Sequence, residues 1–211
     1  MTQPVLFCEN DLLLNDTDPE LPYRRRQDEE KKAIHMGQRK LCLTVLQFIT
    51  IYWDPITKPV VVYAGAAPGI NINIIADLYP NTEFHLYDPA DFKVKPRSNI
   101  HLYQQYFTDT EAREWAIKKI PLLFISDIRT ADYTQAKNLD ENEDQISGDM
   151  DAQMRWYNII KPISAQLKFR LPYTGGSRPL SVDYLDGIIY KQPWAPQTST
   201  ETRLVPIGPE L

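Results

Sequence analysis

The stretch from residue 60 to residue 71 constrains the fold more than any other part of the chain. A continuous apolar run at 60–63 leads into the small-residue sequence Ala-Gly-Ala-Ala-Pro-Gly at 64–69. Apolar residues then recur at helical spacing over 72–79 and stop at Pro80. Strand, tight loop and helix in this order predict the first unit of an open α/β sheet. In such sheets ligands bind outside the carboxyl ends of the strands, where the strand order reverses.

The loop and the next strand together favour an adenosine-bearing cofactor. Gly65 and Gly69 can adopt backbone angles that are forbidden to other residues and can let a ligand approach the main chain, although their spacing is not that of the dinucleotide fingerprint. A second strand is expected at 83–87, and Asp88 follows it directly. A carboxylate about 20 residues beyond a glycine loop can accept hydrogen bonds from a ribose diol. The pattern leaves NAD and S-adenosylmethionine as alternatives, beside a plain turn whose small residues serve packing.

The remaining pattern predicts a single α/β domain at 26–211, preceded by an irregular segment at 1–25. Helices are expected at about 24–52, at 108–119 with a capping box formed by Thr108 and Glu111, and at about 149–167, where Pro162 kinks or divides the helix. Further strands are expected at 100–103, 122–125, 167–173, 182–191 and 202–205, with a hairpin turn or bulge at 186–187. The polar, acidic stretch at 132–148 is predicted to be a mobile loop.

Asp127 follows the fully apolar strand at 122–125, which is of the kind found in parallel sheets. Under the switch-point rule it faces the same crevice as Gly65 and Asp88. The alternative is that Asp127 caps the next element, as aspartates after strands often do.

Composition limits the function classes. A chain of 211 residues can bury one proper core, and its net charge of −5 argues against coating nucleic acid by bulk electrostatics. Cys8 and Cys42 lack metal-ligand spacing, so we expect thiols in a reducing compartment and no metal site. Neither a membrane-spanning run nor a signal-peptide pattern is evident, which predicts a cytoplasmic protein without a membrane partner.

Five segments resemble a single family, and they occur in the family's order. They are residues 35–41, 62–69, 123–129, 161–170 and 194–204. The family is the poxvirus-type cap-specific mRNA 2′-O-methyltransferase, which is also the small, stimulatory subunit of the viral poly(A) polymerase. The resemblance extends from about residue 30 to 207 and implies a Rossmann-like methyltransferase fold with a mostly parallel sheet. It also implies location in the host cytoplasm or the virion.

The resemblance implies a catalytic tetrad of Lys40, Asp127, Lys168 and Glu201, and all four residue types are intact. Lys168 would accept the proton from the 2′-hydroxyl of the first transcribed nucleotide. Because only a neutral lysine can do so, its pKa must fall from the reference value of about 10.4, through desolvation and nearby positive charge. Lys40 and the sulfonium of the cofactor would supply that charge. The two acids would act by positioning.

The resemblance also assigns binding residues. S-adenosylmethionine contacts are implied for Gln38, Gly65, Ala66, Pro68, Gly69, Asp88, Phe107 and Arg129. The family has a basic residue just after the acid of the second strand, whereas Pro89 follows Asp88 here. The methylated guanine of the cap would lie between Tyr23 and Tyr173, in a cation–π arrangement. The family's acidic cap contact just after the second tyrosine is replaced by Thr174. RNA phosphates would be bound by Arg170 and Arg203, within a track that also includes Lys168, Arg178 and Lys191.

Three functional hypotheses follow. The leading one is S-adenosylmethionine-dependent 2′-O-methylation at the 5′ end of capped mRNA. The second is a non-catalytic RNA-binding subunit that keeps a poly(A) polymerase catalytic subunit on its template. The third is a ribose methyltransferase with a different RNA or small-molecule substrate, which would bind cofactor but not cap analogues.

Overall fold

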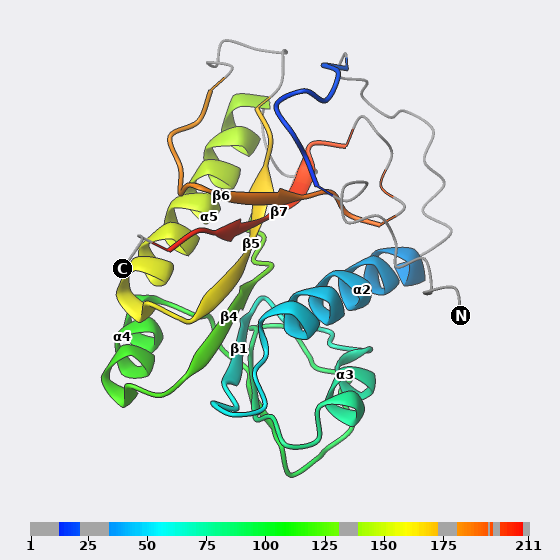
Figure 1. Ribbon diagram of the computed structural model, residues 1–211, viewed down its shortest axis with the longest axis vertical. Helices are drawn as coiled ribbons and strands as arrows, with labels where there is room; N and C mark the ends of the chain where they lie inside the picture. Colours follow the sequence, from blue (N-terminus) through cyan, green and yellow to red (C-terminus); the bar gives the residue numbers. More distant parts are fainter. Residues whose placement is uncertain are drawn as a thin grey trace, which may run out of the picture.

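The computed structural model describes residues 13–21, 34–130, 139–172, 181–193, 195 and 199–208. Figure 1 shows their arrangement. The helices in these ranges are α2 (Ile34–Tyr52), α3 (Ile72–Leu78), α4 (Asp109–Lys118) and α5 (Leu139–Ile160). The strands are β1 (Val60–Ala64), β2 (Phe84–Tyr87), β3 (Ile100–Tyr103), β4 (Leu122–Ser126), β5 (Ser164–Arg170), β6 (Gly187–Tyr190) and β7 (Glu201–Pro206).

These strands form one sheet in the order β3-β2-β1-β4-β5-β7-β6. Strands β1 to β5 pair in parallel, whereas β7 runs antiparallel to both of its neighbours, β5 and β6. The predicted α/β class with a mostly parallel sheet is confirmed. From β1 the chain first builds outward to β2 and β3 and then returns to add β4 on the other side. The strand order therefore reverses between β1 and β4, which is where a ligand is expected.

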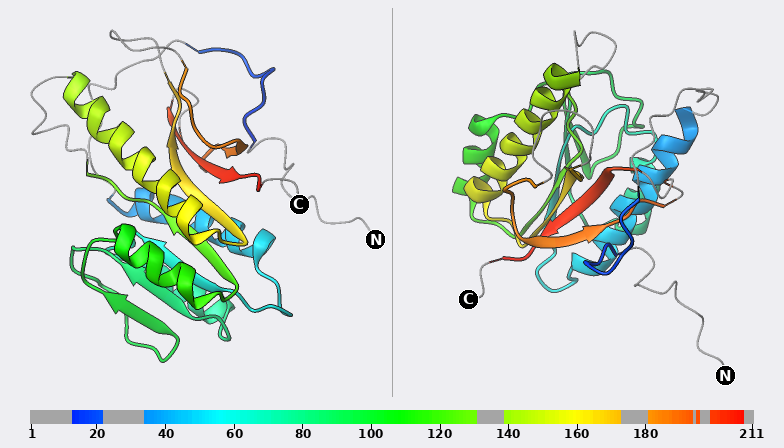
Figure 2. Two further views of the ribbon diagram at one scale, coloured as in Figure 1. Left: turned by 90° about the vertical axis from the view of Figure 1, so that its left-hand side faces the viewer. Right: turned by 90° about the horizontal axis from the view of Figure 1, so that it is seen from above.

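Helices cover both faces of the sheet, giving three layers (Figure 2). Alternate residues of each central strand supply the two cores, since successive side chains point to opposite faces. In β1, Val61 and Tyr63 pack in the cluster that includes Phe48 of α2. Val62 lies in the opposite cluster, which includes Trp156 of α5. Burial on both faces explains the continuous apolar run that is seen in the sequence.

Most predicted elements are confirmed, including the strands at β1, β2, β3, β4 and β7. The capping box that opens α4 is present: the Thr108 hydroxyl accepts from the Thr110 amide, and the Glu111 carboxylate accepts from the Thr108 amide at 2.7 Å. Of the long helix predicted at 24–52, α2 accounts for 34–52, while 22–33 lie outside the described residues. In the described part of the chain, no helix is long and apolar enough to cross a bilayer.

The prediction around α5 is wrong at both ends. The helix begins at Leu139, so residues 139–148 are helical rather than a loop, and it ends at Ile160 rather than near 167. Polar composition suggested a loop, but one face of this segment contacts β5: Glu143 pairs with Arg170 at 2.9 Å. At the other end, Lys161 has a positive φ of 51° and Pro162 has no amide to donate. The chain therefore leaves the helix before β5 begins at Ser164.

The strand predicted at 182–191 is shorter in the structure, where β6 covers only Gly187–Tyr190. Residues 186–187 form neither a hairpin turn nor a bulge, because Gly187 already pairs with Pro206 of β7. A Cβ at Gly187 would lie 2.5 Å from the carbonyl oxygen of Val205, so glycine is required by the close approach of β7. Within the predicted N-terminal segment, Leu13 forms an isolated bridge with Tyr190 of β6.

Candidate active site

The glycine loop after β1 packs against the loop after β4. Gly65 and Gly69 have φ values of 78° and 66°, in the region that favours glycine. A Cβ at Gly65 would lie 2.7 Å from the backbone carbon of Asp127, and one at Gly69 would lie 2.6 Å from the Val94 side chain. The Asp127 amide donates to the Ala64 carbonyl at 2.9 Å. Both glycines are thus needed for packing between loops. The sequence had offered this explanation beside the close approach of a ligand to the main chain.

A cleft of about 340 Å³ opens at this point of the sheet. It brings together all four residues of the predicted tetrad and four of the predicted cofactor residues. Its lining consists of Gly37, Gln38, Lys40, Leu41, Gly65, Ala67, Asp88, Asp127, Arg129, Lys168 and Glu201. The cleft thus lies where the reversal of strand order predicts a ligand site.

Asp88, directly after β2, is held by two backbone amides. Its Oδ2 accepts from the Ala67 amide at 3.0 Å, and its Oδ1 accepts from the Ala90 amide at 2.9 Å. A carboxylate has about four acceptor sites. The two further acceptor sites could receive a pair of neighbouring hydroxyl groups.

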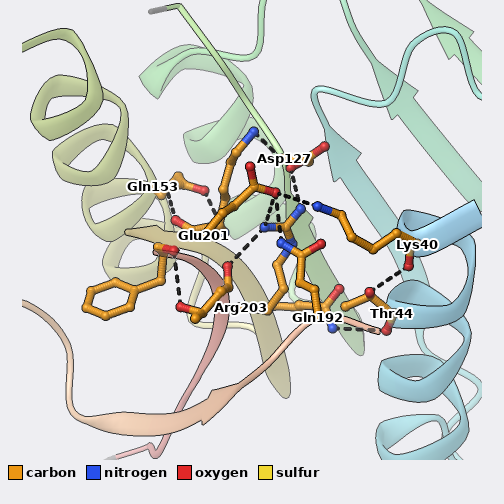
Figure 3. A network of polar contacts seen from close by, with 11 residues as sticks. Lys40, Thr44, Asp127, Gln153, Gln192, Glu201 and Arg203 are labelled. Carbon is orange, nitrogen blue, oxygen red and sulfur yellow. Dashed lines mark hydrogen bonds and ion pairs between the residues drawn. The ribbon is translucent and has the colours of Figure 1, made fainter. Parts of the chain in front are cut away.

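In the tetrad each lysine is paired with one acid. Lys168 Nζ lies 3.2 Å from Asp127 Oδ1, and Lys40 Nζ lies 3.4 Å from Glu201 Oε1. Lys40 comes from α2, Asp127 directly follows β4 and Glu201 begins β7 (Figure 3). Lys168 lies in β5. The ordinary expectation for a lysine in the middle of a helix is exposure to solvent, but the Lys40 side chain is only 24% exposed.

Arg203 joins the two pairs into one network. Its guanidinium lies 2.7 Å from Asp127 Oδ1 and 3.4 Å from Glu201 Oε1, and its side chain is 2% exposed. The prediction that Arg203 contacts RNA phosphates is therefore wrong, because the residue is buried opposite Lys168 in the β5–β7 ladder. A charged residue within the apolar strand Thr-Arg-Leu-Val was the available sequence signal for such a buried role.

Glu201 remains ionised in this setting. Burial raises the pKa of its carboxyl, but the charges of Arg203, Lys168 and Lys40 outweigh that effect and hold the pKa well below its usual range. Gln192 adds a hydrogen bond from its side-chain amide to Glu201 Oε1 at 2.8 Å. Gln192 is 3% exposed, and sequence reasoning missed it because it lies in a connector next to β6.

Helix α5 contributes two further polar residues that sequence reasoning missed. Asp149 accepts from the amide and the hydroxyl of Thr130 at 2.9 and 2.7 Å, which fixes the segment that follows Asp127. Gln153, one turn later, bonds to the backbone of Lys168 at 3.0 and 3.1 Å. The two are 8% and 1% exposed. Their spacing of four residues places both on one face of the helix, a signal that the sequence did contain.

The other predicted residues are less central. Phe107 is 6% exposed and packs edge-on against Tyr87 in the core beneath α4 and α5. Ala66 is buried in the opposite core, and Pro68 binds the Lys93 amide through its carbonyl. Arg170 pairs with Glu143. Tyr23, Tyr173 and Arg178 lie outside the described residues.

The sheet order and the cleft at its reversal define the class of the protein, which has a Rossmann-like methyltransferase fold. A solved structure with this fold is that of bluetongue virus VP4, described as a multifunctional RNA-capping production line; the TM-score is 0.59 and the identity 16%, over 92% of this chain and 28% of VP4. The pattern of the poly(A) polymerase regulatory subunit family matches residues 1–210, so the chain belongs to that family.

A relative in sequence is the cap-specific mRNA (nucleoside-2′-O-)-methyltransferase of Fowlpox virus (strain NVSL). The two sequences are 29% identical over 220 aligned residues, which cover 97% of this chain and 67% of the Fowlpox virus protein. This chain thus spans about two thirds of that relative and little more than a quarter of VP4.

Proposed function

We propose that this protein methylates the 2′-hydroxyl of the first transcribed nucleotide of capped mRNA. One observation carries the proposal: Lys40, Asp127, Lys168 and Glu201, spread over 161 residues of sequence, line a single cleft. A relative that is named for this activity and aligned over 97% of the chain supports it. We propose S-adenosylmethionine as the methyl donor.

The residues of the cleft are suited to that donor. A volume of about 340 Å³ is within the range of small-molecule sites, which is about 300–1,000 Å³. Asp88 retains acceptor sites for a ribose diol, beside the backbone of Gly65 and Ala67. Gln38 and Arg129 complete the polar lining. When bound, S-adenosylmethionine supplies an electrophilic methyl group.

Lys168 is the general base in this proposal. Its Nζ accepts the proton that the ribose 2′-hydroxyl loses, so the amine must be neutral at that moment. Asp127, at 3.2 Å, fixes the direction of the Lys168 side chain, and Arg203 fixes Asp127. Much of the rate is expected from holding the hydroxyl in attack geometry. Tyr23 and Tyr173 remain the candidates for stacking on the methylated guanine.

The test is methyl transfer from labelled S-adenosylmethionine to short RNAs, with and without a cap. We expect label on the first ribose of the capped RNA only, and a loss of at least about 100-fold in Lys168→Ala with cofactor binding retained. Lys118→Ala, on the exposed side of α4, is the matched control and should behave like the wild type. Failure of the wild type to transfer methyl, despite binding both cofactor and capped RNA, would overturn the proposal. Transfer to uncapped RNA would instead indicate a ribose methyltransferase with a different substrate.

Membership of the regulatory subunit family favours a second function: stimulation of a poly(A) polymerase catalytic subunit. The two functions need not share residues. The corresponding test is tail length on a primer RNA, with the polymerase alone and with this protein added. If stimulation is independent of methyl transfer, Lys168→Ala should lengthen the tails as much as the wild type does. Tails that neither protein lengthens would exclude this second function.

A further inference from the structure

The edge of β5 next to β4 loses its partner strand at the catalytic lysine. The parallel ladder between β4 and β5 runs from Leu123 opposite Ser164 to Ser126 opposite Leu167. Strand β4 ends at Ser126, and the Asp127 amide makes the last bond of its ladder with β1, to the Ala64 carbonyl at 2.9 Å. Leu167 is therefore the last residue of β5 with a partner residue in β4, and Lys168 follows it. Its other neighbour, β7, continues in register with Arg203 opposite Lys168.

The side chain of Gln153 occupies the position that the strand has left. The Lys168 amide donates to Gln153 Oε1 at 3.1 Å, and Gln153 Nε2 donates to the Lys168 carbonyl at 3.0 Å. A primary amide offers one acceptor and donors in the same plane, as a peptide group of a neighbouring strand does. Gln153 reaches this position from α5 (Figure 3) and is 1% exposed, so water does not compete for these bonds.

We propose that Gln153 is a positioning residue for Lys168, acting as a substitute for the missing strand. The cleft lies where β4 ends, and beyond that point β4 no longer supplies the Lys168 backbone with all of its hydrogen-bond partners. Gln153 restores them, so β5 stays extended at the residue whose Nζ must meet Asp127 at 3.2 Å. Buried backbone groups require such partners. The inference rests on the proposed function in that Lys168 acts in methyl transfer.

Loss of Gln153 should affect the turnover of methyl transfer but not the binding of the cofactor. Gln153 is not part of the cleft lining, so its loss should leave the affinity for S-adenosylmethionine unchanged. The Lys168 backbone would be held only from the β7 side and less firmly than in the wild type, and small misplacements of a catalytic group cost up to about 100-fold in rate. We therefore expect Gln153→Met, which keeps the length of the side chain but has no amide, to lower kcat by about 10- to 100-fold with KM for the cofactor unchanged.

Two measurements test this: steady-state methyl transfer to capped RNA, and hydrogen exchange of the Lys168 backbone amide by NMR. In Gln153→Met that amide should exchange at least about tenfold faster, because its acceptor is gone. Gln104→Met is the matched control, since the Gln104 amide bonds to Asp91 on the surface and should affect neither readout. Unchanged exchange, or unchanged kcat in a folded Gln153→Met, overturns the proposal.

The role of Gln153 and the proposed methyl transfer can fail independently of each other. If the wild type transfers no methyl, the proposed function fails, whereas the exchange measurement still shows whether Gln153 holds Lys168. Should Gln153→Met not fold, Gln153→Glu answers the same question. Ionised glutamate retains the acceptor for the Lys168 amide and loses the donor to the Lys168 carbonyl, so at a pH above the pKa of the introduced carboxyl exchange should stay slow while kcat falls. Wild-type kcat in that variant overturns the proposal.

Discussion

Replacing Arg203 with methionine tests whether the two acids of the proposed tetrad depend on a shared buried cation. Arg203 is 2% exposed and bridges Asp127 and Glu201 at 2.7 and 3.4 Å. Methionine has a similar length and no charge, so the substitution removes the bridge with little change in packing. Asp127 and Glu201 would then keep Lys168 and Lys40 as their charged partners within the described residues, and Glu201 would also keep its bond from Gln192.

The structure allows the magnitude to be bounded. Removing one partner of a buried ion pair costs about 3–5 kcal/mol in the free energy of unfolding, because a charge is left uncompensated. Asp127 is 13% exposed and would keep Lys168 at 3.2 Å, which reduces the loss. Glu201 is 37% exposed and would keep Lys40, so its share is small. We expect a cost of about 3 kcal/mol at pH 7.

The cost should depend on pH. The folded-state pKa of Glu201 is depressed, so its contribution to stability is fully present above the unfolded pKa of about 4.3 and is lost as the pH falls further. Arg203 is one of the charges that depress this pKa. Without it the folded and unfolded pKa values of Glu201 move closer together, so the difference in stability between wild type and Arg203→Met should shrink as the pH falls below about 4.3.

Urea denaturation at pH 7 and at about pH 3 measures both quantities, because the second value lies below the unfolded pKa of Glu201. Arg113→Met is the control, because Arg113 is 63% exposed and lies 3.7 Å from Asp109 on the surface of α4. Its removal should cost less than about 1 kcal/mol. A cost for Arg203→Met as small as that of the control, or one that is equal at the two pH values, would refute the reasoning.

Three further predictions follow from particular contacts. Gly65→Ala should destabilise the fold by about 2 kcal/mol or more, since φ is 78° and the Cβ would lie 2.7 Å from backbone atoms, whereas Gly148→Ala in α5 has open space and should stabilise by about 0.5–1 kcal/mol; thermal unfolding of both variants checks this. Asp149→Ala should weaken cofactor binding, because it frees Thr130 and the segment before it. Calorimetry measures this affinity, and a value equal to that of the wild type would contradict the role of Asp149 in fixing the segment. Burial, with the nearby charges of His101 and Lys118, lowers the pKa of His85 to about 4. The unfolded state therefore binds a proton below about pH 6.5 that the folded state does not, so stability should fall from pH 6.5 toward pH 4 by at most about 1.4 kcal/mol per unit, and His85→Phe should remove this part of the dependence.

Local patterns predicted the elements whose evidence lies within a few residues. The apolar run at β1, the capping box at Thr108 and the strand before Asp127 each depend on neighbours in sequence, and each is confirmed. The first two turns of α5 did not follow local patterns. Their acidic composition suggested a loop, but the helix is stabilised by contacts with β5, such as that between Glu143 and Arg170, which are separated by 27 residues.

In the candidate site, too, some features depend on neighbours in sequence and others on long-range contacts. The positions of Gly65, Asp88 and Asp127 at strand ends were predictable, because parallel strands bring their carboxyl ends to one edge of the sheet. The role of Arg203 was not, because a strand pattern specifies which face a residue occupies but not which charges it meets there. Gln153 could not be assigned either, since its partner is the backbone of a residue 15 positions away.

The sequence by itself determined the α/β class, the order of most elements and the residue types of the tetrad. Tertiary structure decided the charge pairing: Lys40 with Glu201 across 161 residues, and Arg203 with Asp127 across 76. The physical reason is that hydrophobic periodicity reports burial and backbone conformation, which are local properties. The partner of a buried charge depends instead on strand register and on distances of a few ångströms, which arise only when the whole sheet is assembled.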